Sequence, residues 1–133
     1  MILSNSNIEY IRNNPKYTNW NFICQMYKLS EPIIREFMDY FDWDDISSFQ
    51  SLSENFIREY QDKVDWYYIS WYQSLSESFI KEFQYKVDWS GISAKQSLSG
   101  DFIMEFCNNL NYYLLTTNKK ISQQTKEFCK IFI

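Results

Sequence analysis

The sequence contains no histidine, only two glycines and two prolines, and no long apolar run. Without histidine, imidazole cannot act as a general base or as a metal ligand. The scarcity of glycine and proline argues against the tight hairpin turns of a β-sheet. A membrane span needs about 20 consecutive apolar residues, and residues 1–14 lack the basic-then-apolar pattern of a signal peptide. We therefore expect a cytoplasmic protein with no membrane partner.

Cysteine is scarce too, and its three positions are Cys24, Cys107 and Cys129, without CxxC spacing. Reduced thiols packed as small core residues are the simplest interpretation. Cysteine catalysis would need a base beside the thiol, and a zinc site would need a different ligand spacing. No glycine-rich phosphate loop is present. The sequence therefore predicts no metal, no cofactor and no enzymatic activity.

What the sequence does contain is a repeat of 23 residues that opens on an aromatic side chain. The series is Trp20, Trp43, Trp66, Trp89 and Tyr112, and Leu-Ser and aromatic-Ile pairs keep the same step. Such self-similarity is typical of stacked helical repeats with degenerate ends. We predict one domain, 1–133, with a partial N-terminal cap at 1–19, repeats at 20–42, 43–65, 66–88 and 89–111, and a degenerate C-terminal cap at 112–133.

Each repeat encodes two short helices, because two kinds of start signal alternate along the chain. Ser53 can cap a helix, and Leu52 and Ile57 flank it as a hydrophobic staple. Asp65 repeats the arrangement with Val64 and Ile69. Helices this short are marginal alone, so neighbouring repeats must stack. The predicted fold is all-α, a short α-solenoid of about five two-helix repeats. The expected helix starts are Ser30, Ser53, Ser76, Ser99, Asp42, Asp65 and Asp88.

Polar residues also recur once per repeat. The three series are Glu36, Glu59, Glu82 and Glu105; Ser47, Ser70 and Ser93; and Gln50, Gln73 and Gln96. Two facing carboxylates could in principle carry out glycoside hydrolysis. Active sites, however, are usually single features of a chain, whereas these residues are periodic. We interpret them as structural ladders that satisfy helix-end N–H and C=O groups between layers.

Residues 52–73 read Leu-Ser-Glu-x-Phe-Ile-Arg-Glu-Tyr-Gln-x-Lys-Val-Asp-Trp-x-x-Ile-Ser-x-x-Gln. This run resembles tandem repeats in proteins of mimivirus-like giant viruses, some phages and bacteria. The resemblance covers most of residues 29–106 closely and the ends loosely. It implies a viral or mobile-element origin, and it carries no activity and no site residue.

The charge is uneven along the chain. The net charge is −4, but residues 29–88 hold 13 acidic and 5 basic residues, a net of −8. An acidic face could mimic nucleic-acid phosphates and occupy the basic groove of a nucleic-acid-binding protein. Most of these acids are already assigned to caps, first helical turns or the ladder; Asp39, Asp44, Asp45 and Asp62 are not. Direct binding of nucleic acid is disfavoured, because the only basic cluster, 119–133, is small and terminal.

The repeats differ most on the first helix, at positions beside the recurring tryptophan and isoleucine. There the middle repeat carries Tyr67, Tyr68, Trp71 and Tyr72, and the repeat before it carries Asp44, Asp45 and Phe49. Exposed aromatic side chains are typical of protein–protein hot spots. We predict a non-enzymatic protein-binding module, in its most specific form a virus- or phage-encoded inhibitor of a host defence protein. The alternatives are an acidic nucleic-acid mimic, self-association, and packing of Trp71 and Tyr72 within the solenoid.

Overall fold

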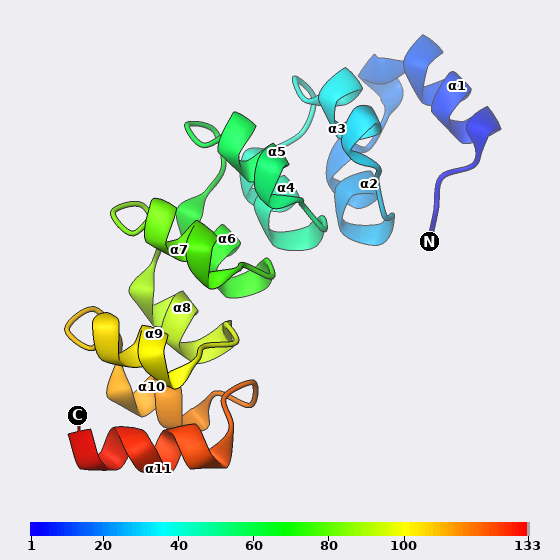
Figure 1. Cartoon of the computed structure of the whole chain (residues 1–133). Helices are drawn as coiled ribbons and strands as arrows, with labels where there is room; N and C mark the ends of the chain where they lie inside the picture. Colours follow the sequence, from blue (N-terminus) through cyan, green and yellow to red (C-terminus); the bar gives the residue numbers. More distant parts are fainter. Residues whose placement is uncertain (133) are drawn as a thin grey trace. The chain divides into compact units, whose positions relative to one another are not determined.

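The computed structural model describes residues 1–132, the side chain of Phe132 excepted. Over this range it contains eleven α-helices, no β-strand and a single isolated bridge between Ile2 and Lys28 (Figure 1). The all-α prediction is confirmed. The helices are α1 (Asn5–Asn13), α2 (Trp20–Met26), α3 (Glu31–Phe37), α4 (Trp43–Phe49), α5 (Glu54–Glu59), α6 (Trp66–Tyr72), α7 (Glu77–Glu82), α8 (Trp89–Lys95), α9 (Gly100–Glu105), α10 (Tyr112–Thr117) and α11 (Gln123–Phe132), with a 3₁₀ turn, η1, at Pro15–Tyr17.

The helices begin where the alternating start signals predict. All seven expected start residues immediately precede a helix. The hydroxyls of Ser53, Ser76 and Ser99 each accept a hydrogen bond from the backbone N–H three residues later, at 3.1–3.2 Å. Ser30 makes no such side-chain bond, and the first turn of α3 contains a proline instead. Polar caps thus fix both helices of a repeat.

The chain divides into two compact units, Met1–Asp65 and Trp66–Ile133. In the first unit, α2 packs on α4. In the second unit, α6 packs on α8 and α8 packs on α10, while α9 packs on α11. First helices therefore pack on first helices of the next repeat, which is the layering of a short α-solenoid, and the predicted fold class is confirmed within each unit.

Residues at equivalent repeat positions form the core. The fully buried side chains include Phe56, Phe79, Phe102 and the isoleucines Ile34, Ile46, Ile57, Ile69, Ile80, Ile92 and Ile103. The recurring tryptophans are half-buried and contact rings of the second helix in their own repeat. Trp66 lies 6.3 Å from Phe79 of α7 and Trp89 lies 6.5 Å from Phe102 of α9, between ring centroids. Each tryptophan thus joins the two helices of its repeat.

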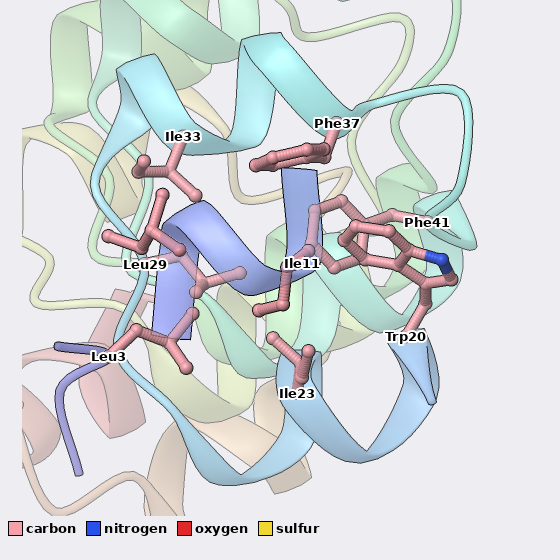
Figure 2. A pocket seen from close by; sticks show the side chains of 9 residues that line it. Leu3, Ile11, Trp20, Ile23, Leu29, Ile33, Phe37 and Phe41 are labelled. Atoms are coloured by element: carbon pink, nitrogen blue, oxygen red, sulfur yellow. The ribbon is translucent and has the colours of Figure 1, made fainter. Parts of the chain in front are cut away.

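The N-terminal segment supplies apolar side chains to the core of the first repeat (Figure 2). Leu3 and Ile11 line one apolar space together with Ile23, Leu29 and Phe37 of α3. The apolar space that these side chains line is too narrow to admit a water molecule. This space is therefore a packing gap within the core, not a ligand site.

Candidate partner-binding surface

The glutamine ladder holds neighbouring repeats together. The Gln96 amide donates to the carbonyl oxygens of Ser70 and Gln73, at 2.9 and 2.7 Å, and its oxygen accepts the backbone N–H of Leu75 at 3.0 Å. Gln50 makes the equivalent bonds two repeats earlier, to Tyr27 and Leu29. Each side chain therefore closes the C-terminal end of the first helix in the preceding repeat. The prediction that the glutamines are structural is confirmed for Gln50 and Gln96.

The serine ladder works in the same way at the other end of the helix. The Ser70 hydroxyl donates to the Trp66 carbonyl at 2.7 Å and accepts the N–H of Asp88 at 2.9 Å. Ser93 repeats both bonds with Trp89 and Asn111. All three ladder serines are fully buried. Because these hydroxyls are satisfied by the backbone, they serve the stacking of repeats.

Asn118 completes the glutamine ladder, and sequence reasoning missed it. Its amide donates to the carbonyl oxygens of Ser93 and Gln96 at 2.8 and 2.9 Å, as Gln96 does one repeat earlier. A strict step of 23 residues would place Lys119 there. A lysine cannot be buried at this point without a partner, so the shorter asparagine one residue earlier takes the position. The sequence did contain a signal, because Asn118 is the only residue next to position 119 with a side-chain amide.

The glutamate ladder forms ion pairs between repeats, not an acid–base pair. Arg35 donates to Glu59 at 2.8 Å and Lys81 donates to Glu105 at 2.6 Å, while Arg12 is bound to Glu36. The hydrogen bond from Arg35 lowers the pKa of Glu59 below its usual range. Each of these carboxylates therefore faces a cation and not a second carboxylate, which does not fit the paired carboxylates of glycoside hydrolysis.

The three cysteines are free, and Cys24 and Cys129 are buried. Burial is the main cause that raises the pKa of the Cys24 thiol to about 12, so it is not a thiolate near neutral pH. Among residues 1–132, no three cysteine or carboxylate side chains are grouped so as to hold a metal ion. None of the described helices is both long and apolar enough to cross a membrane.

The four aromatic residues predicted to bind a partner lie together on α6. Tyr67 and Tyr72 are 52% and 61% exposed, whereas Tyr68 and Trp71 are half-buried. Ring centroids are 5.7 Å apart for Tyr67 and Trp71 and 6.1 Å apart for Tyr68 and Tyr72. Tyr67 and Tyr68 also meet edge to face at 5.4 Å. We call these four side chains the aromatic cluster.

Trp71 connects the aromatic cluster to α8. Its indole N–H donates to the Asp88 carboxylate at 2.8 Å, and the same carboxylate caps α8 by accepting the N–H of Gly91. The Lys95 ammonium lies 5.8 Å from the indole centroid. Trp71 is thus part of the packing of its unit, as the alternative interpretation held for this residue. Tyr67 and Tyr72 face solvent.

The second group of candidate residues lies on α4, in the first unit. Phe49 is 54% exposed, Asp44 is exposed and Asp45 is half-buried. Partial burial, and then the neighbouring carboxylates of Asp42, Asp65 and Asp45, raise the pKa of Asp44. These residues form a locally acidic helix start with one exposed aromatic ring beyond it.

An open pocket of about 300 Å³ in the second unit was not predicted. It is lined by Ala94, Lys95, Thr117, Asn118, Lys119 and Lys120. The sequence places Lys95 in the variable series of the first helix and the other two lysines in the C-terminal basic cluster. Only the packing of α10 on α8 brings them around one space. We call it the lysine pocket.

No protein-family model, curated protein or solved structure matches this chain.

Proposed function

We propose that the chain is a non-enzymatic repeat module that binds another protein through the aromatic cluster on α6. The observation that carries the proposal is that Tyr67 and Tyr72 are each more than half exposed on a single helix. Tyrosine and tryptophan are enriched at the centres of protein interfaces. Burying one such ring in a partner contributes about 1.5–3 kcal/mol from apolar area alone.

The surroundings of the cluster favour binding because they order it in advance. Trp71 is held by Asp88, and Tyr67 lies against Trp71. A ring that is already packed against a fixed neighbour loses little conformational freedom when a partner covers it. The exposed rings are therefore presented on a rigid support.

The resemblance of residues 29–106 to repeats of giant viruses and phages suggests the setting of this function. We propose a viral or phage protein that acts in the host cytoplasm by covering a surface of a host protein, in the most specific form a defence protein. A second copy of the chain is a different occupant for the same surface, and the oligomeric state in solution would reveal it.

A second candidate function, an acidic decoy for a nucleic-acid-binding protein, rests on the first unit. Met1–Asp65 contains 11 acidic and 6 basic residues, a net charge of −5, and three of the aspartates, Asp42, Asp45 and Asp65, lie close to Asp44. Added salt separates the two candidates. A decoy loses affinity steeply as salt rises, whereas an aromatic interface retains most of it.

The test is quantitative capture of partners from host lysate by the wild-type chain and by Tyr67→Ala/Tyr72→Ala. Tyr85→Ala is the matched control, because Tyr85 is 95% exposed and lies outside the cluster. We expect the double variant to lose a specific partner that the control retains, with both variants unfolding at the wild-type temperature. If the double variant captures the same proteins as the wild type, the aromatic cluster is not the binding surface.

A further inference from the structure

The lysine pocket gathers positive charge at one place in an otherwise acidic chain. Lys95 ends α8, and Lys119 and Lys120 follow α10, which ends at Thr117. All three lysines are exposed, and no acidic residue lines the pocket. A volume of about 300 Å³ suits a carboxylate-bearing side chain or a short peptide segment.

The pocket lysines differ from other lysines of the unit, because no carboxylate of the described residues pairs with them. Elsewhere in the unit, Lys81 is paired with Glu105 and Lys130 with Glu127, at 2.6 and 2.9 Å. Within the described chain, none of the three pocket lysines forms an ion pair. Lysines near helix C-terminal ends do offset the helix dipole, but that effect falls off within a turn and amounts to about half a charge per helix. The positive charge of three ammonium groups exceeds what the helix dipoles offset.

The pocket is continuous with the aromatic cluster through one side chain. Lys95 lines the pocket and also lies over the Trp71 indole, 5.8 Å from its centroid. The helices that carry the two features, α6, α8 and α10, pack on one another in this order. A partner that covers the exposed rings of α6 therefore reaches the lysines with the adjoining part of its surface.

We infer that the lysine pocket binds carboxylates of an acidic segment of the partner protein, next to the rings that hold its apolar residues. This inference rests on the proposed function and names the chemistry of the partner. Charge complementarity supports it, because three unpaired ammonium groups attract a segment rich in aspartate or glutamate.

A nucleic acid fits the surface less well than an acidic peptide. Trp66–Ile133 has 7 basic and 6 acidic residues, a net of +1, and the whole chain has a net charge of −4. Nucleic-acid affinity comes from neutralising many phosphates along a strand. Three lysines at one pocket can neutralise few phosphates, whereas three lysines are enough to pair with the carboxylates of one short acidic segment.

The test is a binding titration with a labelled peptide in which a tryptophan is followed by glutamates, and with its glutamine counterpart. Lys95→Gln/Lys119→Gln/Lys120→Gln removes the pocket charges. Lys16→Gln/Lys28→Gln/Lys126→Gln is the matched control, because it changes the net charge equally at exposed or half-buried sites outside the pocket. Pyrophosphate and oligothymidylate serve as competitors, and melting temperatures verify that each variant is folded.

We expect the wild type and the control to bind the glutamate peptide at least about tenfold more tightly than the glutamine peptide, the scale of a charge-assisted hydrogen bond. The pocket variant should bind both peptides alike. Overturning results are no binding of the glutamate peptide at low salt, or equal discrimination by pocket variant and control. The inference is also overturned if oligothymidylate or pyrophosphate displaces the labelled peptide at a lower concentration than unlabelled glutamate peptide does. That result would favour a phosphate ligand.

The same titration separates this inference from the proposed function. Tyr67→Ala/Tyr72→Ala should weaken both peptides by the same factor and leave the preference for glutamate intact. If it changes neither peptide's affinity while the pocket variant abolishes the preference, the lysine pocket stands and the aromatic surface fails. If Tyr67→Ala/Tyr72→Ala weakens the binding of both peptides and the pocket variant binds as the wild type does, the aromatic surface stands and the lysine pocket fails.

Discussion

Trp71 and Gly91 are matched in size across two successive repeats. A Cβ atom built on Gly91 would lie 2.6 Å from Cδ1 of Trp71, closer than any real contact of that kind. The indole therefore occupies the space that a side chain at position 91 would need. This pairing holds Trp71 in place, and Trp71 in turn supports the ring of Tyr67.

Gly91→Ala should destabilise the protein by about 1–3 kcal/mol, because the indole must shift and strain its bond to Asp88. Gly100→Ala is the matched control, since nothing lies within 4 Å of a Cβ at that helical position. It should be neutral or stabilise by about 0.5–1 kcal/mol through reduced chain entropy. Urea unfolding measures both. Equal effects of the two substitutions would mean that Trp71 does not fill the space beside Gly91.

Gln96→Ala should cost about 2–5 kcal/mol, because one buried N–H and two carbonyl groups lose their partner. The neighbouring exposed Ser97→Ala should change the free energy of unfolding by less than about 0.5 kcal/mol. Thermal and urea unfolding decide the matter. One ordinary hydrogen bond contributes about 1 kcal/mol. If Gln96→Ala costs less than this, the ladder is not needed for stacking.

Asp44→Asn should raise the melting temperature near neutral pH and lose that advantage in acid. The raised pKa of Asp44 means that the folded state disfavours its charged form, because of partial burial and three neighbouring aspartates. A carboxyl group with a raised folded-state pKa is destabilising above that pKa, and protonation relieves the effect as pH falls. The exposed Asp39→Asn is a charge-matched control. An equal gain for both variants, or a gain that persists below pH of about 3, would contradict the local repulsion.

The repeat could be read from the sequence because a fixed period carries the core, the caps and the ladders together. The half of the aromatic cluster that faces solvent was also predictable, since Tyr67 and Tyr72 stand where the period imposes no residue type. Three features were not predictable from positions taken one at a time. The fit of Trp71 against Gly91 depends on two repeats at once, Asn118 departs from the period by one residue, and the lysine pocket exists only because α10 packs on α8.

The central claim is that a partner protein covers the exposed rings of α6, and site-specific photocrosslinking tests it most directly. A photoreactive phenylalanine analogue replaces Tyr72 in one variant and Tyr85 in another, and each is irradiated in host lysate. Both tyrosines are exposed, Tyr72 by 61% and Tyr85 by 95%, and belong to the same unit, so the control site is at least as accessible as the test site. We predict a discrete, saturable crosslinked species at position 72 and none at position 85. The same species at both positions, or none at position 72, would contradict the proposal.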